Sequence, residues 1–117
     1  MSVALTLETF DQITAKGIVV IDWWADWCGP CRTFARVFEG ASLGYPAIVF
    51  GRVDTEIEED LANRFEVAAI PTLTVFRDGI LVFSRAGAVG ADALAVLIDH
   101  VLGLDMSLIQ QSRLDQG

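Results

Sequence analysis

Two cysteines spaced by Gly29 and Pro30 are the side chains in this sequence best suited to chemistry. Cys28 and Cys31 are the only cysteines among 117 residues. Two intervening residues let the sulfurs meet, so the pair indicates a dithiol that cycles between thiols and a disulfide. Pro30 lacks a backbone N–H and has a preset φ, which suits the first turn of a helix capped at about Cys28. The N-terminus of that helix would stabilise a thiolate on Cys28, which we therefore expect to be the nucleophile.

Other uses of the cysteine pair stay open at this point. It could form a static disulfide in a turn, supply two ligands of a zinc site, or bind an iron–sulfur cluster between two chains. Zinc favours four ligands, and the only other candidate, His100, is expected far away near the end of the last helix. In a reducing cytosol, a spaced cysteine pair is more often catalytic or metal-binding than structural. We therefore favour redox chemistry and expect no bound metal.

Composition limits the kind of protein that holds this pair. A chain of 117 residues is long enough for one domain with its own core. Hydrophobic residues make up 53% of the chain, yet no apolar run reaches the roughly 18 residues of a membrane span. The formal net charge of -8 argues against nucleic acid and membrane surfaces as partners. The first eight residues show no secretory signal, so a cytoplasmic location is expected.

Strand and helix patterns alternate on both sides of the cysteines. Residues 18–24 are almost all β-branched or aromatic, as in a strand covered on both faces. Asp22 interrupts this run on the side of Val20 and Trp24, so a carboxyl group is expected in the core. Asp78-Gly79 between two apolar runs indicates a two-residue hairpin. Further strands are expected at 47–53, 72–77 and 80–85, and helices from Thr6 to about Lys16, from the cysteines to 40–44, after Thr55, and between Gly90 and Gly103.

The helix after Thr55 has a specific predicted start. Thr55 and Glu58 match a capping box, and Ile57, Leu61 and Phe65 at a spacing of four predict the buried face of this helix. The cluster of acidic residues here is interpreted as chemistry of a helix N-terminus, where the dipole favours anions.

The element order predicts an α/β fold, with a central mixed sheet of about four to five strands flanked by helices on both faces. Residues 1–103 would form this domain. Residues 104–117 would form a C-terminal tail with few apolar anchors, either frayed or docked on a partner.

Over about residues 4–102, the order of elements and one motif resemble the thioredoxin family. The motif is Trp27-Cys28-Gly29-Pro30-Cys31, preceded by Asp22 and followed by Ile70-Pro71-Thr72. The string Trp-Cys-Gly-Pro-Cys is far more specific than two cysteines at the same spacing. The resemblance implies a thioredoxin-like fold and a protein-disulfide reductase.

The resemblance also implies a role for each matching residue. Cys28 would attack a substrate disulfide, and Cys31 would resolve the mixed disulfide that forms. Asp22 would move protons to and from Cys31. The residues that position the sulfurs would be Gly29, Pro30 and Pro71, the last after a cis peptide bond. The apolar rim on which a substrate chain lies as an added strand would contain Trp27, Ile70, Gly87 and Ala88.

Three residues depart from the family pattern. A lysine usually lies near the buried aspartate, and we place Phe50 at its position. Without that cation, burial should raise the pKa of Asp22 further than in a relative with the lysine. Arg36 replaces a proline that kinks the helix in many members, which would change packing but not the sulfur geometry. Arg32 replaces another cation, a lysine, and little change is expected.

The implied function is a general thiol-disulfide oxidoreductase that takes part in electron transport and cell redox homeostasis. The protein would need no bound cofactor beyond its redox-active Cys28–Cys31 disulfide. Electrons would come indirectly from NADPH through a thioredoxin reductase. Its partners would be that reductase and proteins with disulfides, and a monomer is expected.

Two other functions stay open. The fold could serve as a binding or chaperone module for a dedicated partner, with the dithiol secondary. Phe50, the acidic surface and the tail at 104–117 keep this alternative open. The protein could also be an oxidant in an exported compartment, but Gly29-Pro30 argues against this because the family's oxidants usually carry other dipeptides there.

Overall fold

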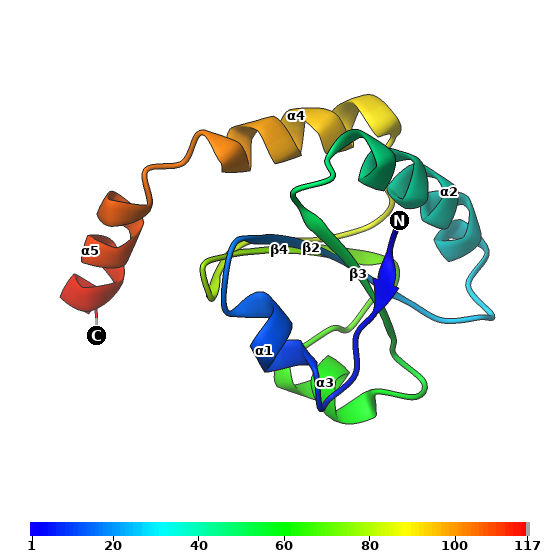
Figure 1. The fold of residues 1–117 in the computed structure, drawn as a ribbon. Helices are drawn as coiled ribbons and strands as arrows, with labels where there is room; N and C mark the ends of the chain where they lie inside the picture. Colours follow the sequence, from blue (N-terminus) through cyan, green and yellow to red (C-terminus); the bar gives the residue numbers. More distant parts are fainter. Residues whose placement is uncertain (117) are drawn as a thin grey trace.

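A five-stranded mixed sheet forms the centre of the molecule, and helices cover both of its faces (Figure 1). The computed structural model describes residues 1–116. The strands lie in the order β1-β3-β2-β4-β5, with β3 parallel to β1 and β2, and β4 antiparallel to β2 and β5. The strands are β1 (Val3–Ala4), β2 (Ile18–Trp24), β3 (Val49–Asp54), β4 (Thr72–Arg77) and β5 (Ile80–Ala86). The helices are α1 (Phe10–Thr14), α2 (Gly29–Gly44), α3 (Glu59–Arg64), α4 (Ala91–Leu102) and α5 (Met106–Gln116).

This architecture confirms the predicted α/β fold and adds one strand, β1, and one helix, α5, to the predicted elements. β1 was missed because two residues are too few to show the alternation that identifies a strand. Among residues 1–116, no helix is both long and apolar enough to cross a membrane.

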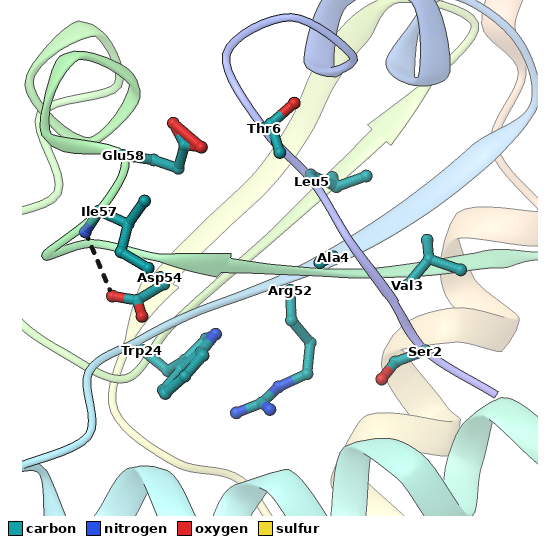
Figure 2. A pocket seen from close by; sticks show the side chains of 10 residues that line it. All are labelled: Ser2, Val3, Ala4, Leu5, Thr6, Trp24, Arg52, Asp54, Ile57 and Glu58. Atoms are coloured by element: carbon teal, nitrogen blue, oxygen red, sulfur yellow. Dashed lines mark hydrogen bonds between the residues drawn. The ribbon is translucent and has the colours of Figure 1, made fainter.

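The segment between β3 and α3 differs from the capping box predicted at Thr55. The N-cap residue of α3 is Glu58, and it makes no side-chain capping hydrogen bond. Instead, Asp54 Oδ1 accepts a hydrogen bond of 2.9 Å from the backbone N–H of Glu56. It accepts a second one of 3.4 Å from the N–H of Ile57 (Figure 2). Ile57 is 75% exposed, so the predicted buried stripe was wrong at its first position. The turn at Asp54 delays the helix by about one turn.

The first helix also begins later than predicted. The carbonyl of Thr6 accepts hydrogen bonds from the N–H groups of both Thr9 and Phe10, so a turn precedes α1. The hairpin prediction is confirmed, because Asp78 (φ 52°) and Gly79 (φ 83°) both take the positive φ of a two-residue turn between β4 and β5.

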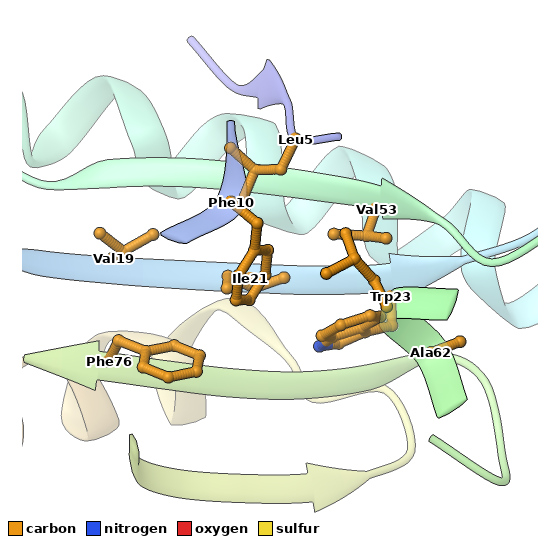
Figure 3. Packing of buried hydrophobic residues seen from close by; sticks show 9 residues of the cluster. Leu5, Phe10, Val19, Ile21, Trp23, Val53, Ala62 and Phe76 are labelled. Carbon is orange, nitrogen blue, oxygen red and sulfur yellow. The ribbon is translucent and has the colours of Figure 1, made fainter. Parts of the chain in front are cut away.

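The two faces of β2 belong to two separate cores. Successive strand residues point to opposite faces, which explains the nearly unbroken apolar run predicted for this strand. The cluster under α1 and α3 contains Phe10, Val19, Ile21, Trp23, Val53 and Leu61, several of which are drawn in Figure 3. The cluster under α2 and α4 contains Val20, Phe34, Phe38, Phe50, Leu73 and Ile98. Asp22 points to this second side.

The C-terminal end of α4 is fixed by backbone and side-chain donors. Gly103 ends the helix as predicted, and its N–H donates to the carbonyls of Asp99 and His100. Arg77 Nη1 donates to the carbonyls of Val101 (2.7 Å) and Leu104 (3.2 Å). Beyond this point, α5 extends away from the sheet and from the helices that cover it (Figure 1).

Candidate active site

The two cysteines lie where β2 gives way to α2, and they form a disulfide. Cys28 is the N-cap residue of α2, with extended backbone (φ -87°, ψ 109°), as predicted. Its Sγ accepts a hydrogen bond of 3.2 Å from the backbone N–H of Cys31. The Cα atoms of the pair are 5.2 Å apart, within the usual range of a disulfide. One free N–H group of the first helical turn, that of Cys31, therefore points at the sulfur of Cys28.

Two loops from distant parts of the chain meet at this sulfur. The peptide bond between Ile70 and Pro71 is cis, as the family resemblance implied. Cys28 Sγ lies 3.8 Å from the carbonyl oxygen of Ile70. The carbonyl of Pro71 accepts a hydrogen bond of 2.8 Å from the N–H of Gly87. Ile70, Pro71 and Gly87 are thus brought to one side of the disulfide, and Ala88 follows as an exposed residue.

Trp27 is the most exposed tryptophan, with 69% of its surface accessible, as predicted. Its indole N–H donates a hydrogen bond of 2.7 Å to Glu56 Oε1. Glu56 was predicted only to favour the start of a helix, so its contact with the rim of the site was missed. No local pattern could have found it, because the two residues are 29 positions apart.

Asp22 is fully buried beneath this surface. Arg52 Nε donates a hydrogen bond of 3.1 Å to Asp22 Oδ2, whereas Oδ1 has no hydrogen-bond partner among the described residues. Burial disfavours the charged form and raises the pKa of Asp22 to about 6, and Arg52 partly opposes that rise. The carboxyl group can therefore gain or lose a proton near neutral pH.

The prediction that Phe50 leaves Asp22 without a cation was wrong. In the register of β2 and β3, Val20 pairs with Phe50 and Asp22 pairs with Arg52. Phe50 is a core residue that packs against Phe38, with ring centroids 5.2 Å apart. Residues 50 and 52 point to the same face, so the sequence pattern alone could not decide which one lies beside the aspartate.

A cleft of about 330 Å³ connects the resolving position with this ion pair. It is lined by Cys31, by Arg52 and by the ring of Trp24. Arg32 and Asp26 lie at the same cleft, and Arg32 Nη2 donates to the carbonyl of Asp26. Arg52 was not predicted as a site residue, yet it contacts Asp22 and shares the cleft with Cys31.

The remaining residues singled out from the sequence lie on helices α2 and α4. Gly29 and Pro30 are exposed in the first turn of α2. This helix continues without interruption through Arg36. His100 lies in the last turn of α4, as predicted, and is exposed. Within residues 1–116, no group of three or more His, Cys, Asp or Glu side chains is placed to hold a metal ion.

A disulfide at a helix N-terminus can exchange with another disulfide, because the helix stabilises the thiolate that forms on reduction. The fold and this site together define the class of thiol-disulfide oxidoreductases with a central mixed sheet and a cis-proline beside the cysteines.

Comparison with known proteins specifies the family. The family model for thioredoxin matches residues 1–100. The chain is 42% identical to a putative thioredoxin 2 of Streptomyces coelicolor over 116 residues, which cover 98% of this chain and 87% of that protein. It is 38% identical over 91 residues to a thioredoxin of Coprinus comatus, covering 75% of this chain and 86% of the relative. The solved structure of Plasmodium falciparum thioredoxin superposes with a TM-score of 0.78 at 30% identity, covering 86% of this chain and 98% of that one. The structure of Malassezia sympodialis thioredoxin gives a TM-score of 0.77 at 30% identity, covering 86% of this chain and 90% of the other.

The chain belongs to the thioredoxin family. It is a protein-disulfide reductase with a redox-active cysteine pair. The alternative of a binding or chaperone module is not favoured by these relatives.

Proposed function

We propose that Cys28 is the attacking nucleophile of this reductase, that Cys31 is the resolving cysteine, and that Asp22 exchanges the proton of Cys31. The observation that carries this assignment is the hydrogen bond from the Cys31 N–H to Cys28 Sγ at the start of α2. A backbone N–H at a helix N-terminus stabilises negative charge on the sulfur it faces.

The reaction is a transfer of two electrons in two exchange steps. The Cys28 thiolate attacks one sulfur of a substrate disulfide, and the other substrate sulfur leaves as a thiolate that takes up a proton. Cys31 then loses its proton to ionised Asp22, and its thiolate attacks the sulfur of Cys28. The second substrate thiolate leaves, so the substrate is reduced and the Cys28–Cys31 disulfide forms.

The substrate chain would lie across the rim formed by Trp27, Ile70, Gly87 and Ala88. Support comes from the exposure of Trp27 and from the closeness of the Ile70 carbonyl to Cys28 Sγ. Extended peptides bind in this way by adding backbone hydrogen bonds to exposed backbone groups. The residues that hold this geometry would be Gly29, Pro30 and Pro71.

The domain that does this chemistry would be residues 1–103, with 104–117 as a separate tail. It would work as a monomer in the cytoplasm, where a reducing environment suits a protein that donates electrons. An NADPH-dependent thioredoxin reductase would restore the dithiol after each turnover, and proteins with accessible disulfides would be the substrates.

Trapping the mixed disulfide tests the roles of the cysteines. Reduced Cys31→Ser protein mixed with insulin should accumulate a covalent complex through Cys28, because the resolving thiol is missing. The matched Cys28→Ser variant should form none under the same conditions. Mass spectrometry of the unreduced mixture identifies the cysteine that is bonded to insulin. A complex that forms through Cys31 in the Cys28→Ser variant, and none in Cys31→Ser, would reverse the assignment.

The electron donor can be tested separately. The wild-type chain with NADPH, a bacterial thioredoxin reductase and insulin should consume NADPH at a rate that rises with the concentration of the chain. Reduction supported by glutathione and not by the reductase would contradict the proposed donor.

A further inference from the structure

Trp24, Arg52 and Asp22 lie in contact on one face of the sheet. Asp22 and Trp24 are two positions apart in β2, and Arg52 pairs with Asp22 across β3, so all three side chains leave the same face. The guanidinium carbon of Arg52 lies 4.5 Å from the centre of the Trp24 ring. Figure 2 shows the side chains of Trp24 and Arg52 next to each other. Arg52 Nε also donates a hydrogen bond to the buried carboxylate of Asp22.

We propose that Trp24 is a positioning residue of the exchange reaction, and that its indole ring holds the Arg52 guanidinium against Asp22. This inference rests on the proposed role of Asp22 in moving the proton of Cys31. A cation over the face of a tryptophan ring is attracted by the ring's negative face. The flat guanidinium group is well suited to such stacking.

Arg52 needs a neighbour to hold it because two clefts lie beside its side chain. One cleft of about 330 Å³ lies toward β1 and the start of α3, and the cleft shared with Cys31, of similar size, lies toward α2. Both clefts are lined by Trp24 and Arg52. The side chain of Arg52 is 25% exposed, and its only hydrogen bond among the described residues is the one to Asp22. A long side chain between two clefts has room to turn away unless a neighbour holds it.

Other charged groups lie near the guanidinium. Glu39 of α2 is close enough for Arg52 to lower the pKa of its carboxyl group, although its hydrogen bonds to Ser2 are the larger cause. Asp54 and Glu58 line the cleft toward β1. Without the Trp24 ring, Arg52 could turn toward these carboxylates and leave Asp22.

Arg52 is the charged group that faces Asp22 most directly and lowers its pKa. Arg52 faces Asp22 from β3, whereas the residue paired with Asp22 on β4 is Leu73, which does not titrate. From α2, Cys31 lines the cleft next to Arg52, with Arg32 and Asp26 at the same cleft. Arg52 lowers the pKa of Asp22 against the effect of burial. Loss of its position should therefore raise that pKa and leave less ionised Asp22 to accept the proton of Cys31 at neutral pH.

The test is a carboxyl NMR titration of Asp22 in the full chain, in wild type and in Trp24→Leu, Trp24→Phe, Arg52→Met and Trp24→Leu/Arg52→Met. Arg52→Met should raise the titration midpoint by about one pH unit. Trp24→Leu should raise it at least half as much, and Trp24→Phe less, because the phenyl ring retains part of the attraction. In the double variant the midpoint should equal that of Arg52→Met alone, since Trp24 acts through Arg52.

Two outcomes would overturn the proposal. One is an unchanged midpoint in Trp24→Leu, and the other is a further rise in the double variant beyond Arg52→Met. If Trp24→Leu does not fold, the midpoint is measured in Trp24→Phe and in Trp24→Phe/Arg52→Met instead. A rise in this double variant beyond Arg52→Met alone would likewise overturn the proposal. The pH profile of insulin reduction should move with the midpoint.

This titration separates the inference from the proposed function. If Asp22→Asn reduces insulin as fast as wild type at every pH, Asp22 has no role in proton transfer. The NMR midpoint still reports whether Trp24 holds Arg52 at Asp22, because it is measured without a substrate.

Discussion

The carboxyl group of Asp22 experiences two opposing influences. Burial raises its pKa, and the Arg52 guanidinium at 3.1 Å lowers it. Burial is the larger effect, so the charged form of Asp22 destabilises the folded protein relative to the protonated form. This destabilisation falls at the position where the proposed mechanism needs a proton acceptor near neutral pH.

The stability of the protein should therefore depend on pH through Asp22. The folded-state pKa is about 6, above the ordinary value of 3.8. The favourable contribution of protonated Asp22 is complete below pH 3.8 and is lost as the pH rises through about 6. We expect Asp22→Asn to stabilise the oxidised protein by up to about 3 kcal/mol at pH 8 and by little at pH 4, at about 1.36 kcal/mol per pKa unit. Urea unfolding at both values measures this.

Asp11→Asn is the matched control for that experiment. Hydrogen bonds from Arg64 hold the pKa of the exposed Asp11 below its usual value. Its effect should have the opposite sign, a small loss of stability at neutral pH that fades in acid. Equal stability changes for Asp22→Asn at pH 4 and pH 8 would contradict the assigned pKa.

Site residues that form a local sequence pattern could be predicted, whereas site residues that reach the site from another strand or loop could not. Cys28 and Cys31 form a contiguous motif, and Asp22 is conspicuous as a carboxylate in an apolar run. Arg52 and Glu56 reach the site from another strand and from a loop. Their contacts depend on strand register and loop conformation, which a single sequence does not specify.

At the scale of elements, β1 is held by a close contact that involves a glycine. Gly51 of β3 pairs with Val3, and Leu5, which follows β1, lies directly over it. A Cβ at position 51 would lie 2.5 Å from Leu5 Cδ1 and 2.8 Å from Leu5 Cγ. Leu5 is only 2% exposed, so it has little room to move. A side chain at position 51 would therefore displace Leu5, the residue that follows β1.

Gly51→Ala should accordingly destabilise the protein by about 1–3 kcal/mol, the usual range for overpacking in a core. Gly40→Ala in α2 is the control, since a Cβ there meets nothing within 4 Å. It should stabilise by about 0.5–1 kcal/mol, because alanine favours a helix over glycine. The comparison is made by urea unfolding at neutral pH. Equal stability of the two variants would mean that β1 moves aside at little cost.

For the whole molecule, the question is where the domain ends. The family model ends at residue 100, whereas the packing continues slightly further. Leu104 packs against the core under α2 and α4, and Arg77 holds its carbonyl oxygen. α5 begins two residues later and lies away from the sheet (Figure 1). Gly103 predicts a boundary at residue 103. The few apolar residues of the following segment show no clear periodicity, so they do not predict whether that segment is helical.

Removal of residues 106–117 should therefore leave the domain intact. The free energy of unfolding should change by less than about 1 kcal/mol, because contacts of Arg77 and Leu104 remain. Removal of 102–117 is the informative comparison. It deletes two of the three carbonyl groups that accept from Arg77, and the Gly103 cap with them. Loss of these hydrogen bonds to a charged donor should cost about 1–3 kcal/mol.

Both truncations can be measured by urea unfolding together with insulin reduction. The shorter deletion should retain wild-type reduction rates, because the tail follows the end of the chain that Arg77 binds. Arg77 pairs with Ile18 at the start of β2, whereas the cysteines follow the other end of that strand. A large loss of stability on removal of 106–117 would show that α5 docks on the domain in solution. Lost activity with unchanged stability would instead mean that the tail contacts the substrate or the reductase, which would extend the functional chain to its C-terminal segment.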